Sequence, residues 1–242
     1  MNQEQEKIYN ELVSKYNFNT LQRFQIRLGF KNNIDVDWYA KPEYNADQMK
    51  EIRFGLENNV DVSIYTNPEF SSWQMKQICD GLIRKLDVSI YAKLEFDYNQ
   101  MVQIYIGLKK NLDVSIYARP EYDYMQMLQI RVGLEENLDI SLYSGSEFNW
   151  EQMNQIMRGL RNNINASLYS NPEFTWGQME EIRLGLENGI DVTSYLNPSI
   201  NKKEMKQILL GLEKEIDVSS YLNPGIHWKE MEKVRLELER YK

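Results

Sequence analysis

Apolar and polar residues follow a helical spacing along most of the chain, and the pattern recurs every 26 residues. Eight methionines stand at this interval, from Met49 to Met231, without one insertion. A Gly-Leu pair comes six residues after each of the first seven, from Gly55-Leu56 to Gly211-Leu212. Fixed periods of 20–50 residues are typical of stacked repeat proteins, so the sequence predicts a tandem repeat.

Each repeat opens with the signals of a helix start. In the third repeat Ser71 is a favourable N-cap, and Gln74 completes a capping box three residues later. Met75, Ile78 and Leu82 then follow at i, i+3 and i+7, which places them on one face of a helix. The pattern predicts a long helix of about 13 residues with this apolar face turned inward.

A shorter helix of about five residues is predicted to follow. The long helix ends near Lys85, where most other repeats have asparagine or glycine, which tolerate left-handed backbone. Asp87 is placed to cap the short helix, and an X-Pro pair ends it in most repeats. A column of aspartates can also bind calcium, but Asn165 interrupts it, which favours capping. The column contains Asp35, Asp61, Asp87, Asp113, Asp139, Asp191 and Asp217.

The predicted fold is all-α: an α-solenoid of eight complete two-helix repeats of 26 residues. These repeats occupy residues 18–225. Residues 1–17 form an N-terminal capping helix, and residues 226–242 form a truncated ninth repeat that caps the C-terminal end. A glycine within a helix costs about 1 kcal/mol relative to alanine. Its recurrence predicts close packing, with a tyrosine such as Tyr65 lying against Gly55.

Other repeated positions carry further expectations. A second glutamine column, which includes Gln77 and Gln155, is predicted to bond backbone in the neighbouring repeat. The short helix holds an aliphatic residue and then a small one in the middle repeats, as in Ile90 and Ala92. The last two complete repeats reverse this order, as in Ser194 and Leu196, so one aliphatic group is expected to fill the same space from either place.

The charge and the cysteine content limit the classes of partner and the cellular compartment that fit this protein. The net charge of −8 argues against direct binding to nucleic acid or to an anionic membrane, since both need a basic surface. Cys79 is the sole cysteine, which excludes an intrachain disulfide and fits a reducing compartment. The polar N-terminus and the absence of any run of about 18 apolar residues predict a cytoplasmic protein without a membrane span.

The sequence contains few candidate catalytic residues. His227 is the sole histidine, and Cys79 lies nearly six repeats away. No histidine and cysteine cluster suits zinc, and the glycines are single and evenly spaced rather than grouped in a phosphate-binding loop. The sequence predicts a non-enzymatic protein without metal or cofactor.

The outward face of the long helices varies between repeats and is rich in apolar residues in the middle of the chain. Two interpretations of these residues are open: packing between adjacent long helices, or an exposed surface that binds another protein or a second copy of the chain. The candidate partner-binding residues are Phe54, Trp73, Tyr98, Val102, Tyr105, Ile106, Tyr124, Met125, Leu128, Val132, Trp150 and Trp176.

The segments FDYNQMVQIYIGLKKNLDVSIYARPE and FTWGQMEEIRLGLENGIDVTSYLNPS show the repeat in full. This pattern resembles a tandem helical repeat found in proteins of anaerobic gut Firmicutes and their mobile elements. The resemblance covers residues 18–242 and implies a biological setting without a mechanism.

Three functions are consistent with these observations. The first is a protein-binding scaffold. In its more specific form, the protein is a phage or mobile-element inhibitor of a host defence protein, such as a nuclease with a basic groove. The second is an acidic mimic of nucleic acid that occupies a basic groove. The third is a sponge for a small signalling molecule, which requires a pocket.

Overall fold

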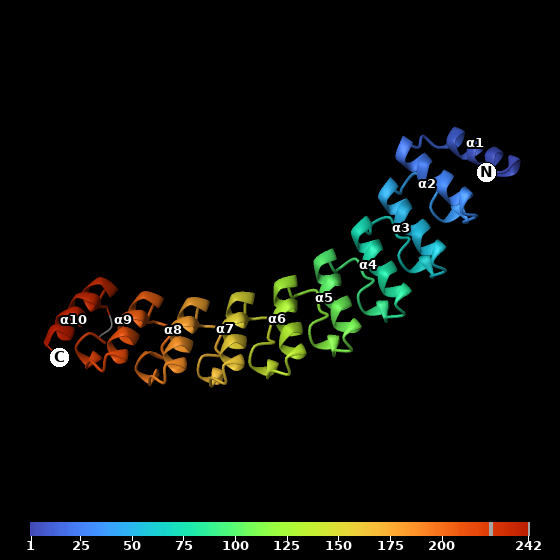
Figure 1. Cartoon of the computed structure of the whole chain (residues 1–242). Coiled ribbons are helices and arrows are strands. Elements are labelled where there is room, and N and C mark those ends of the chain that lie inside the picture. Colours follow the sequence, from blue (N-terminus) through green and yellow to red (C-terminus); the bar gives the residue numbers. More distant parts are fainter. Residues whose placement is uncertain (223–224, 242) are drawn as a thin grey trace. The chain divides into compact units, whose positions relative to one another are not determined.

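The computed structural model describes residues 1–222 and 225–241, which form ten α-helices joined by eight 3-10 turns (Figure 1). The pair Asn223-Pro224, an X-Pro pair predicted to end a short helix, lies outside the described residues. The helices are α1 (Gln3–Lys15), α2 (Thr20–Lys31), α3 (Ala46–Glu57), α4 (Ser72–Ile83), α5 (Tyr98–Lys109), α6 (Tyr124–Glu135), α7 (Trp150–Arg161), α8 (Trp176–Glu187), α9 (Lys202–Glu213) and α10 (Trp228–Tyr241). The turns are η1 (Val36–Trp38), η2 (Val62–Ile64), η3 (Val88–Ile90), η4 (Val114–Ile116), η5 (Ile140–Leu142), η6 (Ala166–Leu168), η7 (Thr193–Tyr195) and η8 (Val218–Ser220).

The chain divides into two compact units, unit 1 (Met1–Tyr124) and unit 2 (Met125–Lys242). In unit 1, α1 packs on α2, and α2, α3 and α4 pack on α3, α4 and α5 respectively. In unit 2, α7 to α10 pack in the same sequential way. The predicted all-α helical-repeat solenoid is confirmed, and helices α2 to α9 each contain 12 residues, close to the predicted length.

The predicted five-residue short helix is wrong, because each one is a single 3-10 turn of three residues. In η2 the Asp61 carboxylate accepts the backbone N–H of Ser63 at 3.0 Å. The Tyr65 N–H then donates to the Val62 carbonyl at 3.0 Å, and Tyr65 itself leaves helical geometry with φ −132°. A single i→i+3 hydrogen bond closes the turn. The helix does not continue because the next residue, Tyr65, has a non-helical backbone.

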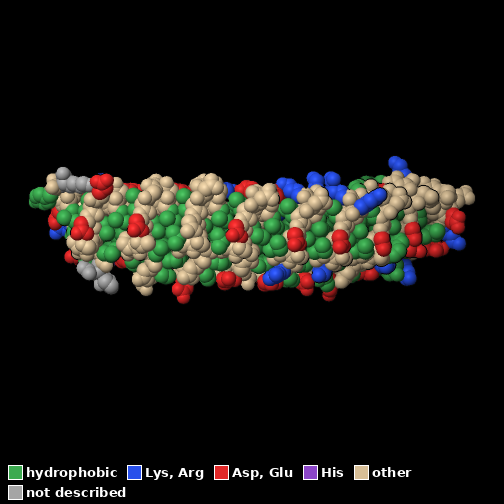
Figure 2. All heavy atoms as spheres, turned by 90° about the horizontal axis from the view of Figure 1, so that it is seen from below, with side chains coloured by type: hydrophobic (Ala, Val, Ile, Leu, Met, Phe, Trp, Pro, Cys, Tyr) green, Lys and Arg blue, Asp and Glu red, His purple; other side chains and the backbone are tan. Residues whose placement is uncertain are grey.

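The aspartate column caps these turns, as predicted. Each of its seven members accepts the backbone N–H two residues further on. Asn165 differs: its side chain accepts the Ser167 hydroxyl at 2.6 Å and makes no backbone capping bond. Acidic side chains recur along the face of the molecule seen in Figure 2, with apolar side chains between them.

The long helices end at left-handed residues, which also agrees with the prediction. Asn59 has φ 56°, and asparagine occupies the equivalent position in most repeats. Gly189 takes this place with φ 72°, while Lys85 and Glu215 adopt the same conformation with longer side chains.

The contact between glycine and tyrosine is the most regular packing feature of the fold. Tyr65 is fully buried, and its hydroxyl donates to the Glu51 carbonyl at 3.3 Å. A Cβ atom at Gly55 would lie 1.9 Å from the Tyr65 hydroxyl oxygen and 2.9 Å from a methyl carbon of Val62. The prediction that the glycine admits the tyrosine is confirmed, and the same tyrosine contact recurs at the eight glycines that stand 26 residues apart, from Gly29 to Gly211.

The first glutamine column does more than cap helices. Gln48 accepts the Asn45 N–H at 2.8 Å, which closes the predicted capping box. Its amide nitrogen also donates to the Phe70 carbonyl at 2.7 Å in the next repeat and to the Pro68 carbonyl at 2.9 Å near the end of its own repeat. From Gln22 to Gln178 this column therefore ties each repeat to its successor through buried or partly buried hydrogen bonds.

The second glutamine column was predicted to bond backbone, and this is wrong for the glutamines that an arginine reaches. The Gln155 side-chain oxygen accepts Nε of Arg183 at 3.0 Å, and Gln25 accepts Nε of Arg53 at 3.2 Å. Arg183 also pairs with Glu187, four residues further along its helix, at 2.5 Å. Burial of Arg183 is offset because its charge is paired and its nitrogens are hydrogen-bonded.

Two repeats have glutamate in this column, Glu51 and Glu181, and both side chains are buried. The repeats that follow them have Cys79 and Leu209 in the arginine position. From the second repeat onward, each arginine of this column already pairs with a glutamate of its own helix, as Arg183 does, so a second carboxylate would be unmatched.

Replacing Glu181 with glutamine is expected to stabilise the protein at neutral pH. Burial raises the pKa of this carboxyl, against the opposing effect of Lys202 and Lys206. Its folded-state pKa therefore lies above the unfolded value, so stability is lost as pH rises through the folded pKa. Urea unfolding should show Glu181→Gln more stable than the parent protein at pH 7, with the difference shrinking as the pH falls toward 4.

Glu173→Gln, at an exposed position of the same unit, is the control for this comparison. An equal gain from Glu181→Gln at both pH values would contradict the assignment to ionisation.

Candidate protein-binding surface

The helix spacing defines an outer face on each long helix. Helix positions 2, 5, 9 and 12 fall within an arc of about 80°, given 3.6 residues per turn. In α4 these positions hold Trp73, Lys76, Asp80 and Ile83. The buried stripe of Met75 and Ile78 lies on the opposite side, so the outer face is free of the repeat's own core.

The twelve predicted partner-binding residues divide between the two interpretations. Phe54, Trp73, Tyr124 and Trp176 are exposed, by 39% to 60% of their surface. The other eight are half-buried, and none is fully buried. These eight are Tyr98, Val102, Tyr105, Ile106, Met125, Leu128, Val132 and Trp150.

Packing against the adjacent helix explains part of the half-burial. Tyr98 lies at the first position of α5, and its ring centre is 5.7 Å from that of Trp73 on α4. In unit 2 the Lys202 ammonium lies 4.8 Å from the ring centre of Trp176 and 2.6 Å from a Glu180 carboxylate oxygen. Tyr98 and Trp176, each at the first position of its helix, therefore contact side chains of a neighbouring helix, although Trp176 keeps 44% of its surface exposed.

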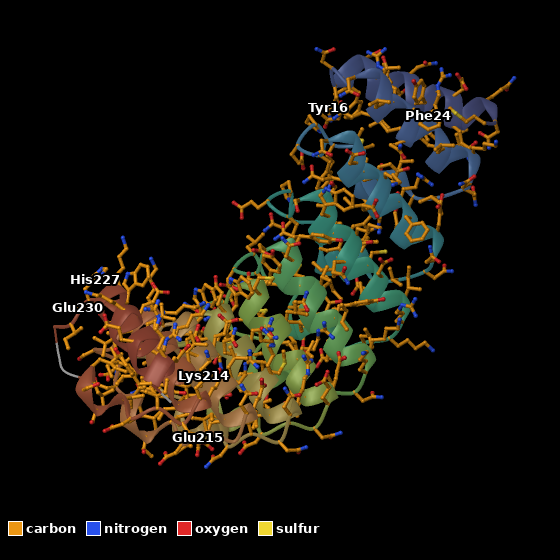
Figure 3. The ribbon with its side chains drawn as sticks, turned by 60° about the vertical axis from the view of Figure 1, so that its left-hand side comes forward. Tyr16, Phe24, Lys214, Glu215, His227 and Glu230 are labelled. Atoms are coloured by element: carbon orange, nitrogen blue, oxygen red, sulfur yellow. The ribbon has the colours of Figure 1, made fainter. Side chains whose placement is uncertain are left out.

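The sequence reasoning missed three exposed apolar residues at outer helix positions. Leu21 is 65% exposed and Phe24 is 54% exposed on α2, and Ile83 at the end of α4 is 37% exposed. Phe24 projects from the N-terminal part of unit 1 (Figure 3). Comparison of helix positions 2, 5 and 12 in every repeat would have revealed them, whereas attention to the middle repeats did not.

The exposed apolar residues are concentrated in unit 1. Of fifteen large apolar residues that are exposed in the described part of the chain, eleven lie in unit 1 and four in unit 2. Five of the eleven occupy outer helix positions, and we refer to them as the unit 1 apolar face. They are Leu21, Phe24, Phe54, Trp73 and Ile83.

A shallow groove crosses this face. It has a volume of about 610 Å³ and is lined by residues of α3, α4 and α5, including Phe54, Ile83 and Tyr105. Asp80 and Arg84 also line it, so charged groups stand beside the apolar side chains. Asp80 takes the helix position that Phe54 holds in α3, with a smaller side chain.

Unit 2 covers its outer positions differently. Arg161 and Glu136 form a two-pronged ion pair with nitrogen–oxygen distances of 2.5 and 2.6 Å. Lys214 pairs with Glu239 at 2.7 Å. Hydrogen bonding from Arg161 holds the pKa of the Glu136 carboxyl below its usual range. Paired charges on neighbouring helices thus take the place of the apolar side chains seen in unit 1.

No family model, curated protein or solved structure matches this chain.

The described residues offer little for catalysis. Burial raises the pKa of the Cys79 thiol to about 11, so the thiolate is scarce at neutral pH. His227 is exposed at the start of α10, where its ring nitrogen accepts the Lys229 N–H at 3.3 Å. Within residues 1–222 and 225–241, no group of three or more histidine, cysteine or acidic side chains is placed to hold a metal ion. None of the described helices has the length and apolar character needed to cross a bilayer.

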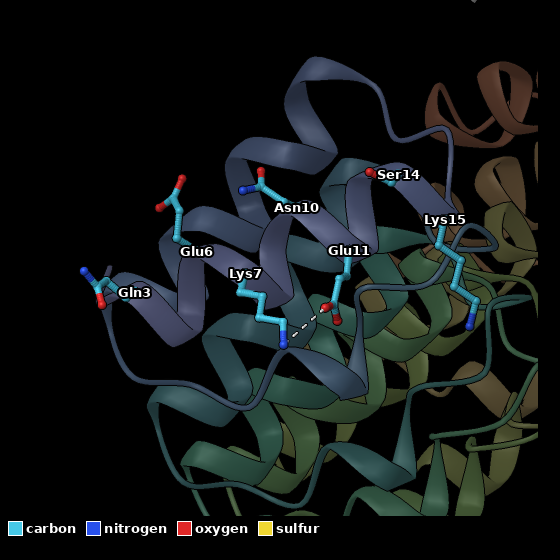
Figure 4. A pocket seen from close by; sticks show the side chains of 7 residues that line it. All are labelled: Gln3, Glu6, Lys7, Asn10, Glu11, Ser14 and Lys15. Atoms are coloured by element: carbon cyan, nitrogen blue, oxygen red, sulfur yellow. Dashed lines mark ion pairs between the residues drawn. The ribbon is translucent and has the colours of Figure 1, made fainter.

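The hollow along α1 is a solvated helix surface. All seven residues that line it belong to α1, and they are all polar or charged (Figure 4). Lys7 and Glu11 stand 4.0 Å apart across it as an exposed i,i+4 pair. Such a surface lacks the enclosure and apolar lining of a ligand site.

Proposed function

We propose that this chain is a non-enzymatic repeat scaffold that binds another protein, and that the unit 1 apolar face is the binding surface. The concentration of exposed large apolar side chains in unit 1 carries this proposal. Phe54, Ile83 and Tyr105 line one groove, and grouped apolar side chains on a surface, unlike singly scattered ones, mark interaction sites.

The composition of the face supports a protein partner. Trp73 and Phe54 are large rigid side chains of the type that anchors protein interfaces. The exposed ammonium of Lys76 lies 4.0 Å from Asp80, so both charge signs are present at the margin. A mixed margin around apolar anchors suits a folded protein surface better than it suits nucleic acid, which requires a basic one.

The test begins with capture from a host-cell lysate and continues with the purified pair. Trp73→Ala and Phe54→Ala should each weaken binding about thirtyfold in calorimetry, the effect typical of an interface anchor. Leu168→Ala is the control, because Leu168 is an exposed apolar residue of unit 2, outside the proposed surface. Binding that is unaffected by the unit 1 substitutions would overturn the proposal.

Salt dependence separates this proposal from an acidic mimic of nucleic acid. Apolar anchoring should change little between low and high ionic strength, whereas a mimic that binds a basic groove should lose affinity steeply. The more specific hypothesis of a phage or mobile-element inhibitor makes the captured protein a host defence protein, and the same experiment identifies it.

A further inference from the structure

A cavity of about 580 Å³ opens in unit 2, beside turns η7 and η8 and helices α9 and α10. It lies in the C-terminal part of the unit, where Figure 3 labels Lys214 and His227. The cavity falls within the size range of small-molecule sites. Aliphatic side chains form much of its lining: Leu196, Ile200, Ile208, Leu222, Ile226 and Met231.

A change in the repeat sequence accounts for this space. The residue before the long-helix N-cap is Phe or Tyr in the first seven repeats, from Phe18 to Phe174, and every one is buried. In the last two it is Ile200 and Ile226, which are half-buried and line the cavity. Replacing an aromatic ring by a smaller side chain in a packed interior leaves volume unfilled.

A second change enlarges the same space. Ser194 stands where the earlier turns have an aliphatic residue such as Ile90, and Leu196 stands where Ala92 does. The sequence led us to expect this exchange to keep the interior filled, but both Ser194 and Leu196 line the cavity. The exchange is therefore incomplete, and Ser194 has a buried hydroxyl oxygen without a hydrogen-bond partner. A buried polar atom of this kind costs free energy until a ligand or water bonds to it.

The polar groups at the cavity indicate the charge of a suitable ligand. Thr193, Asn197, Ser199 and Glu204 add polar groups to the lining, and no basic side chain is among the described residues that form it. The Glu204 carboxylate accepts the Asn201 N–H at 3.0 Å and brings negative charge to the site. This carboxylate disfavours an anionic ligand, and the largely aliphatic lining favours a neutral ligand over a cation, which would lose its hydration there.

We propose that this cavity binds a compact, neutral, largely apolar molecule that carries one hydrogen-bonding group directed at the Ser194 hydroxyl. Binding is favoured because the ligand and the aliphatic lining remove apolar surface area from water. The hydroxyl supplies the polar contact that orients the ligand. The site lies in unit 2 and goes beyond the proposed protein-binding function, on which it does not depend.

The test uses N-phenyl-1-naphthylamine, a neutral fluorescent probe with apolar rings and one N–H donor. Saturable binding with one site per chain is expected for the unaltered protein. Ile226→Phe and Ile200→Phe restore the aromatic residue of the earlier repeats and fill the cavity. Each should lower probe affinity at least about tenfold while raising the thermal midpoint by about 2–4 °C.

Two controls locate the probe. Ile64→Phe makes the same substitution at an exposed position of unit 1 and should leave affinity unchanged. Trp73→Ala tests whether the probe lies instead on the unit 1 apolar face. Probe binding that persists in both cavity-filling variants, or that is lost in Trp73→Ala, would overturn the assignment, as would a failure of the unaltered protein to bind the probe.

Discussion

Gly55→Ala is expected to destabilise the protein by about 3 kcal/mol, although alanine is the better helix former by about 1 kcal/mol. The added methyl group would lie 1.9 Å from the Tyr65 hydroxyl oxygen and 2.9 Å from a carbon of Val62. Tyr65 is fully buried, so its ring has no free space to enter. The α3 backbone and η2 must separate, which breaks packing within the second repeat. Urea unfolding followed by circular dichroism measures the loss.

Two variants show whether the tyrosine hydroxyl is the cause. Tyr65→Phe removes the atom nearest to the added methyl, so the Gly55→Ala and Tyr65→Phe double variant should recover part of the stability lost by Gly55→Ala alone. Glu237 holds the equivalent place in α10, which no turn follows among the described residues, and Glu237→Ala should be close to neutral. A Gly55→Ala protein as stable as the parent would contradict this account.

The sequence was sufficient to predict features that depend on residues close together in the chain. The capping box of Ser71 with Gln74 and the aspartate cap of η2 lie within three residues of their partners. The glycine–tyrosine contact spans only ten residues, and its repetition exposed it. Local hydrogen-bonding and steric rules are enough for contacts of this kind.

Contacts between repeats were harder to predict from the sequence, because they depend on the register of one helix on the next. Gln155 and Arg183 are 28 residues apart, and their contact depends on how α7 and α8 pack. A signal was present in the sequence: an arginine follows Gln155 and Gln25 by 28 residues, whereas Leu209 follows Glu181 by the same interval. Comparing two columns with each other, rather than one at a time, would have paired these residues.

The candidate surface was only partly predictable for a related reason. Helix periodicity identifies the outward arc, but the exposure of a residue depends on the side chains of the adjacent helix. Tyr98 is partly covered by its contact with Trp73, whereas Phe24 on α2 remains exposed. The division into units 1 and 2 has no counterpart in the repeat pattern, so the concentration of apolar residues in unit 1 emerged from the structure.

Gln152→Ala is expected to lower the free energy of unfolding by about 3 kcal/mol, since the Gln152 side chain takes part in three buried or partly buried hydrogen bonds. The Gln152 amide nitrogen donates to the Phe174 carbonyl at 2.6 Å and to the Pro172 carbonyl at 3.0 Å. Its oxygen accepts the Asn149 N–H at 2.8 Å. Alanine leaves all three backbone groups without this partner and weakens the junction between α7 and the next repeat.

Gln74→Ala provides a matched comparison in unit 1. Gln74 donates to one carbonyl of the next repeat, that of Phe96 at 2.8 Å, and it is half-buried rather than buried. Its loss should therefore cost about half as much as the loss of Gln152. Equal costs at the two positions would show that capping, which both share, dominates over the bonds between repeats.

Gln152→Glu separates these roles through its pH dependence. A carboxylate still accepts the Asn149 N–H, but it also faces two carbonyl oxygens without a donor, so the ionised form is disfavoured in the folded protein. The folded-state pKa of the new carboxyl must rise above its unfolded value, and stability is then lost as pH increases through that range. Thermal unfolding should place Gln152→Glu near the parent protein at pH 4 and well below it at pH 7. A stability deficit that is the same at both pH values would show that the carbonyls of Phe174 and Pro172 do not govern this position.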